Sequence, residues 1–103
     1  MAYKVQFALT RPSTDIPWQN NLESNEVAGD HGRPAELVAE SGGSFERTSS
    51  PDGLSMNTVY TFPDIAAWQA YHQAVAPIWN RNDVAGRMNT AGITVAVEVI
   101  ENT

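Results

Sequence analysis

The chain has 103 residues, of which 42% are hydrophobic and 17% charged, and these proportions are typical of an ordinary globular chain rather than a disordered one. Twelve acidic residues outnumber six basic ones, which gives a formal charge of −6, and the basic residues are scattered along the sequence. Nucleic acid and anionic membranes are therefore excluded as expected partners, because both require a concentrated positive surface.

Cysteine is absent, which excludes disulfides, thiolate nucleophiles and zinc–thiolate sites. The first thirteen residues alternate polar with apolar side chains and lack the continuous apolar core of a signal peptide. No stretch approaches the roughly 18 apolar residues that a membrane span needs. We expect a soluble, cytoplasmic protein that folds as a single domain over residues 1–103.

The first strand is predicted from the alternation of apolar and polar residues, and the first helix from the residues that start and stop it. Apolar residues alternate with polar or small ones from 3 to 9, which predicts a strand with one buried face that ends at the Arg-Pro pair of 11–12. Residues 13–32 fit no single period and are expected to mix loop with a turn or two of helix. A short helix is predicted over 34–40, because Pro34 suits its first position and two glycines at 42–43 stop it.

A hairpin follows this short helix. Residues 45–49 form a weak strand by composition, and the Ser-Pro-Asp-Gly sequence of 50–53 favours a tight turn. Residues 54–62 then alternate, which places Met56, Thr58, Tyr60 and Phe62 on one face of the second hairpin strand.

The strongest pattern begins at Asp64, whose carboxylate can cap a helix. A period of 3.6 residues gathers seven side chains on one half of that helix: Ile65, Trp68, Tyr71, His72, Val75, Ile78 and Trp79. Pro77 predicts a kink or a restart. A short helical segment capped by Asn82 or Asp83 follows, and the alternating residues 93–99 form the last strand.

The resulting order is strand, helix, strand, strand, helix, strand. Right-handed crossovers fold it into an α+β, ferredoxin-like βαββαβ sandwich, a four-stranded antiparallel sheet with both helical regions on one face and the terminal strands adjacent in its centre. The opposite face carries small or moderately polar residues: Lys4, Gln6, Ala8, Thr10, Asn57, Val59, Thr61, Thr94, Ala96 and Glu98. This face is either solvated or packed against a second copy of the chain.

The strand that leads into Phe62-Pro63-Asp64, followed by a helix carrying Trp68, Tyr71 and His72, resembles the dimeric α/β-barrel superfamily, which includes antibiotic-biosynthesis-type monooxygenases and related cyclases and isomerases. The local motif spans 62–79. The resemblance implies a homodimer, a pocket for an aromatic or polyketide-like molecule, and chemistry by a few polar side chains without a metal or flavin. The broken first helical region departs from the long first helix of that family.

His72 is the first catalytic candidate, because a histidine on the margin of the apolar half can act as a general base near neutral pH, with Tyr71 or His31 as polar partners. The structural alternative is a packed ring bonded to a backbone carbonyl. Trp68, Tyr71 and Trp79 could form an aromatic wall for a flat ligand, or could simply be core residues.

The loop cluster of Asp30, His31 and Arg33 is the second candidate, since Arg33 could grip a carboxylate with two parallel bonds. The alternative is that these three side chains are simply exposed to solvent on a loop and have no role in binding. Trp18 could cover one mouth of the sheet, fasten a neighbouring subunit or pack in the core. The polar segment 80–89 is a lid, a dimer contact or a solvated connection.

No metal site is expected, because neither histidine has a second strong ligand three or four residues away on a helix. No cofactor-binding motif is present either. The leading hypothesis is a small homodimer that binds an apolar or aromatic small molecule, with cofactor-independent monooxygenase, cyclase or isomerase activity as its catalytic form. The competing hypothesis is a non-catalytic assembly module, and a viral or accessory protein of unassigned role would show the same pattern.

Overall fold

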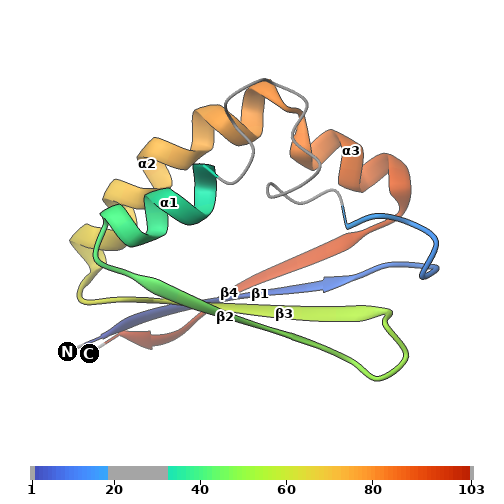
Figure 1. Ribbon diagram of the computed structural model, residues 1–103, viewed down its shortest axis with the longest axis horizontal. Helices are drawn as coiled ribbons and strands as arrows, with labels where there is room; N and C mark the ends of the chain where they lie inside the picture. Colours follow the sequence, from blue (N-terminus) through green and yellow to red (C-terminus); the bar gives the residue numbers. More distant parts are fainter. Residues whose placement is uncertain (1, 19–32, 103) are drawn as a thin grey trace.

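The computed structural model describes residues 2–18 and 33–102. Within them the elements are β1 (Tyr3–Thr10), α1 (Arg33–Glu40), β2 (Ser44–Ser49), β3 (Ser55–Phe62), α2 (Ile65–Arg81), α3 (Val84–Ala91) and β4 (Thr94–Asn102). The strands form one antiparallel sheet in the order β2-β3-β1-β4, and the described helices lie on one of its faces (Figure 1). The fold is the predicted ferredoxin-like α+β sandwich.

The two terminal strands are neighbours, as the sequence predicts, but they do not both lie in the centre of the sheet. β1 pairs with β3 on one side and with β4 on the other, so β4 is an edge strand and the central placement expected for it is wrong. Alternation identifies the two faces of a strand but does not identify its neighbours. Val95, Val97 and Val99 consequently remain 44%, 57% and 48% exposed.

α2 is the longest described helix, and it begins as predicted. The Ala67 N–H donates to Asp64 Oδ1 at 2.9 Å, which satisfies one of the unpaired donors of the first turn. Of the predicted apolar half, three residues are fully buried, namely Tyr71, Val75 and Ile78. Trp68 and Trp79 are partly buried, whereas Ile65 and His72 are exposed, so the buried stripe is narrower than the pattern predicts.

α2 continues through Pro77, and the helix does not restart there. Pro77 is exposed, while Ile78 is buried in the core on the next position. Packing of the residues after the proline therefore compensates for the one backbone hydrogen bond that it removes.

The junction between α2 and α3 turns the chain back over the sheet. Buried Asn82 donates from Nδ2 to the Ile78 carbonyl at 2.8 Å, and Asp83 adopts the left-handed conformation with φ of 52°. α3 then ends at Gly92, whose φ of 80° favours glycine, and the Ile93 N–H donates to the Met88 carbonyl at 2.9 Å. The short helix predicted after Asn82 is confirmed.

The core is divided into two clusters of buried side chains. The larger lies beneath α1 and α2 and contains Leu37, Val38, Tyr60, Phe62, Tyr71, Val75 and Ile78. The smaller contains Leu9, Met56 and Ile93 at the other end of the sheet. Phe7 on β1 is partly buried and packs against both clusters.

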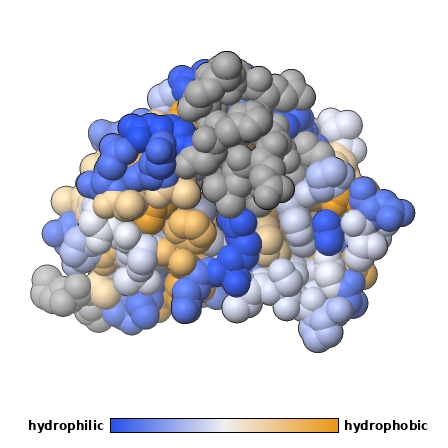
Figure 2. Space-filling view, in the orientation of Figure 1, coloured by the Kyte–Doolittle hydropathy of each residue, from blue (hydrophilic) through white to orange (hydrophobic). Residues whose placement is uncertain are grey.

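Hydrophobic residues also reach the surface along the layer boundary. On the face seen in Figure 2 they show through in a band between the hydrophilic outer side of α1 and the sheet. The molecule measures 39 × 32 × 17 Å, and Figure 1, which looks along the shortest dimension, shows the helix layer stacked on the strand layer within the plane of the view.

Candidate functional site

A cavity of about 390 Å³ lies between the helix side of the sheet and the segment formed by the end of α2 and by α3. This volume falls in the range of roughly 300–1,000 Å³ that is typical of ligand pockets. Its walls are mostly apolar and join the two core clusters, with Phe7, Leu9, Met56, Val84, Met88 and Ile93 among the lining residues.

The cavity has a buried floor and an exposed rim. Met56, Thr58 and Tyr60 of β3 form the floor and are all buried. Val95 on β4 and Asn89 on α3 also line the cavity, but both are exposed. Exposed residues of the β4 edge and of α3 therefore form part of the cavity rim.

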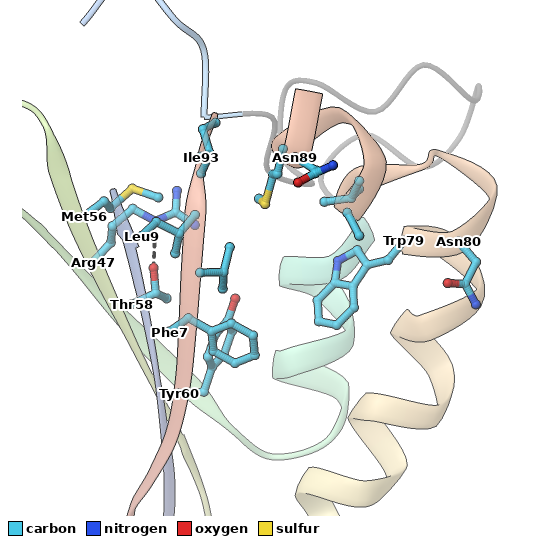
Figure 3. Close-up of a pocket in the computed structure, with 14 residues that line it drawn as sticks. Phe7, Leu9, Arg47, Met56, Thr58, Tyr60, Trp79, Asn80, Asn89 and Ile93 are labelled. Atoms are coloured by element: carbon cyan, nitrogen blue, oxygen red, sulfur yellow. Dashed lines mark hydrogen bonds between the residues drawn. The ribbon is translucent and has the colours of Figure 1, made fainter. Parts of the chain in front are cut away.

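Arg47 is the one charged residue among the described residues that line the cavity, and it enters from β2 on the sheet side (Figure 3). Its Nε donates to the Thr58 hydroxyl at 3.4 Å, which is a long hydrogen bond. Its guanidinium carbon lies 5.8 Å from the centre of the Phe45 ring. Within residues 2–18 and 33–102 no carboxylate lies within salt-bridge distance of Arg47, and none lines the cavity.

Trp79 approaches from the opposite wall, because it projects from α2 into the space above the sheet (Figure 3). Its indole Nε1 is buried and has no hydrogen-bond partner among the described residues. Because this nitrogen is shielded from solvent, Trp79 lines the cavity with the apolar surface of its ring. Asn80 and Asn89 add amide groups on this helical side.

Tyr60 completes the polar lining of the floor. Its ring meets that of Phe7 edge-on at a centroid distance of 5.3 Å. Burial raises the pKa of Tyr60, and the interaction with the neighbouring Tyr71 side chain and then the positive charge of Arg47 oppose this effect without reversing it. The phenol is therefore protonated at neutral pH and can donate a hydrogen bond. Taken together, the polar groups of the floor supply donors in an otherwise apolar cavity.

No family model and no curated protein matches the chain. Among solved structures it is similar to a hydantoinase/carbamoylase-family amidase from Burkholderia multivorans (16% identity, TM-score 0.46) and to another from Burkholderia ambifaria (11%, 0.46). A putative amidohydrolase/peptidase from Burkholderia cenocepacia is also similar (13%, 0.43). The matches cover 97%, 99% and 97% of this chain but only 27%, 28% and 27% of those chains, so the chain spans about a quarter of their length.

Of the residues proposed from the sequence on the long helix, only Trp79 lines the cavity. Trp68 packs between Phe62 and Tyr71, at ring-centroid distances of 5.7 and 5.9 Å. Tyr71 is fully buried in the larger core cluster. His72 is exposed, and its ring lies 5.5 Å from that of Trp68 and 6.3 Å from that of Trp79.

The other proposed residues lie away from the cavity or outside the described residues. Arg33 is on the surface of α1, where it bonds Glu36 at 3.5 Å and also Glu40. Trp18 packs against the smaller core cluster, and the guanidinium carbon of Arg11 lies 4.4 Å from the centre of its ring. Asp30 and His31 lie outside the described residues. The role of His31 as a polar partner of His72 therefore stays a prediction.

Sequence reasoning did not propose Arg47 or Thr58 as site residues. A signal was available, because alternation along β2 places Arg47 on the same face as Phe45. Phe45 is paired with Tyr60, and Arg47 is paired with Thr58. A basic residue in phase with apolar neighbours on a half-buried strand indicates a charge directed inward.

The described residues contain no group of three or more histidine, cysteine or carboxylate side chains arranged to hold a metal ion. None of the helices in the described part of the chain is both long and apolar enough to cross a bilayer.

Proposed function

We propose that this protein binds a small apolar molecule, in particular an aromatic one, in the cavity between its sheet and the α2–α3 segment, and that it does so as a homodimer. The single observation that carries the binding proposal is the cavity of about 390 Å³ with predominantly apolar walls and a few polar groups. That combination is typical of small-molecule sites, in which apolar surface supplies affinity and polar groups fix orientation.

Binding is better supported than catalysis by a histidine. His72 is absent from the cavity lining, and burial raises the pKa of Tyr60, which makes this phenol a poor general base near neutral pH. The resemblance to the dimeric α/β-barrel superfamily favours the same kind of ligand. We therefore propose ligand binding first, and cofactor-independent catalysis as an additional activity that would require this binding.

The homodimer is proposed through the outer face of the sheet, the one opposite the helices. Gln6, Ala8, Asn57 and Val59 lie near its middle, and none of them is fully exposed or charged. The described helices all lie on the other face, so none of them covers this surface (Figure 1). A non-catalytic assembly module would use the same surface and is the alternative function.

The cavity proposal is tested by blocking its rim. Val95 lines the cavity and is 44% exposed, whereas Val97 lies on the same face of β4, is 57% exposed and does not line it. Both sites accept an aromatic residue on an edge strand without burying it in the core. Val95→Trp should weaken binding of naphthalene-2-carboxamide, a neutral aromatic probe, by about 10-fold or more, measured by isothermal titration calorimetry.

Val97→Trp is the matched control and should leave the affinity within about 3-fold of that of the unmodified protein. Equal loss in both variants would place the probe on the β4 surface rather than in the cavity. Absence of binding to the unmodified protein by this probe and by the corresponding acid, 2-naphthoic acid, both at millimolar concentration, would reject the binding function.

A further inference from the structure

We infer that the ligand of this cavity carries an anionic end, most simply a carboxylate, which is held by Arg47 on the floor while its apolar body lies against the walls. This inference rests on the proposed function and adds the chemical class of the ligand. Its first support is position, because Arg47 brings a permanent positive charge into an apolar cavity in which none of the described lining residues is acidic.

The second support is the bonding of Arg47 within the described residues. A guanidinium has five N–H donors in a planar fork. One of them reaches the Thr58 hydroxyl at a long 3.4 Å, and no carboxylate neutralises the charge. Arg33, in contrast, bonds two glutamates on α1, and Arg11 donates to the carbonyls of Gly53 and Ile16 at 2.9 and 2.8 Å.

The third support comes from the other polar groups of the cavity. The Tyr60 phenol lies on the floor and stays protonated, so it can donate to an acceptor oxygen of a ligand. A carboxylate supplies such oxygens and also matches the paired N–H groups of Arg47.

The negative overall charge of the protein makes a preference for an anionic ligand a specific test of Arg47. A chain with a formal charge of −6 repels anions at long range, so a preference for an acid over a neutral molecule of the same shape has to come from local groups. An inward charge on an edge strand such as β2 also hinders edge-to-edge association. A comparison of two probes separates this protective role from recognition of a ligand.

The experiment compares 2-naphthoic acid with naphthalene-2-carboxamide at pH 7.5 by isothermal titration calorimetry. The two probes share one ring system and differ in charge. The unmodified protein should bind the acid about 10-fold or more tightly than the amide. Arg47→Met, which keeps the apolar stem, should abolish this preference, because it should weaken binding of the acid about 10-fold or more relative to binding of the amide. Arg33→Met is the matched control, because it removes a surface arginine outside the cavity lining, and it should keep the preference.

If Arg47→Met does not fold by circular dichroism, Arg47→Gln gives the same comparison with a polar neutral side chain. An unmodified protein that binds both probes equally, or an Arg47 variant that keeps the preference, overturns the anionic-ligand inference and leaves the cavity function intact. Failure of both probes to bind overturns the inference and the proposed function together.

Discussion

Among single residues, Tyr71 was a site candidate from the sequence but is a core residue in the structure, and its buried hydroxyl is energetically unfavourable. Its side chain is fully buried, and its hydroxyl has no hydrogen-bond partner among the described residues. The Tyr60 and Tyr71 rings lie 5.7 Å apart, close enough for each to affect the titration of the other, but the Tyr71 hydroxyl does not reach hydrogen-bond geometry. Removing this oxygen should therefore stabilise the fold.

We expect Tyr71→Phe to raise the free energy of unfolding by about 1 kcal/mol in urea titrations, because a buried hydroxyl without a partner is removed. Burial, and next the neighbouring Tyr60, raise the pKa of Tyr71 in the folded protein. Stability linked to this group is therefore complete below the unfolded value near pH 10 and is lost as pH rises above it. Tyr71→Phe should lose less stability between pH 9 and 11 than the unmodified protein.

Tyr60→Phe is the control for this change. The Tyr60 hydroxyl lines the cavity, where solvent or a ligand can bond it, so its removal should give a smaller gain. A lower free energy of unfolding for Tyr71→Phe at pH 7 would show that the hydroxyl has a partner and would contradict its assignment as an unpaired core group.

At the scale of elements, α2 depends on its first turn, because this turn fixes where the helix begins to cross the sheet. Asp64 holds it through the bond from the Ala67 N–H at 2.9 Å. Asp64→Ala should lower the free energy of unfolding by about 1 kcal/mol. Asp64→Asn should lose much less stability, since asparagine is also a good N-cap. Urea denaturation followed by circular dichroism measures both, and equal loss in the two variants would contradict capping as the cause.

The elements were the part of the fold that the sequence could predict. Proline, glycine and aspartate mark their boundaries through local chemistry, as in the turn where Gly53, with φ of 75°, donates to the Ser50 carbonyl at 3.0 Å. The pairing of β1 with β4 also followed from element order. The edge position of β4 could not be predicted in this way, because alternation shows which face of a strand is buried but not which strands lie beside it.

The cavity was harder to predict for a related reason. Its lining comes from all four strands and from two helices, so it depends on how the layers meet and not on any local pattern. His72 was the first catalytic candidate because an imidazole can act as a general base near neutral pH, but in the structure it is exposed and does not line the cavity. Arg47 lies in a strand that is weak by composition, so its alternation with Phe45 was a faint signal, and its pairing with Thr58 shows that it is on the helix side of the sheet.

At the scale of the whole molecule, the two faces of the sheet have different roles in the proposal. The helix side carries the aromatic core and the cavity, whereas the outer side carries small and polar residues. Val97 and its neighbours on β4 form a second exposed apolar surface at the sheet edge. A dimer could therefore form through the outer face or through the β4 edge, and substitutions on each surface separate the two.

Ala8 lies on the inner strand β1 opposite Asn57 on one side and Ala96 on the other, so it marks the middle of the outer face. We expect Ala8→Arg to place a bulky charge in a face-to-face interface and to weaken dimerisation by about 100-fold or more, measured by sedimentation equilibrium. Val97→Arg places the same side chain on the β4 edge and should leave the dimer intact. The reverse result would assign the interface to the edge, and a monomeric unmodified protein at 100 µM would remove the dimer from the proposal. Since the cavity is built from residues of one chain, an Ala8→Arg monomer should still bind naphthalene-2-carboxamide, which makes the dimer and the ligand site independent claims.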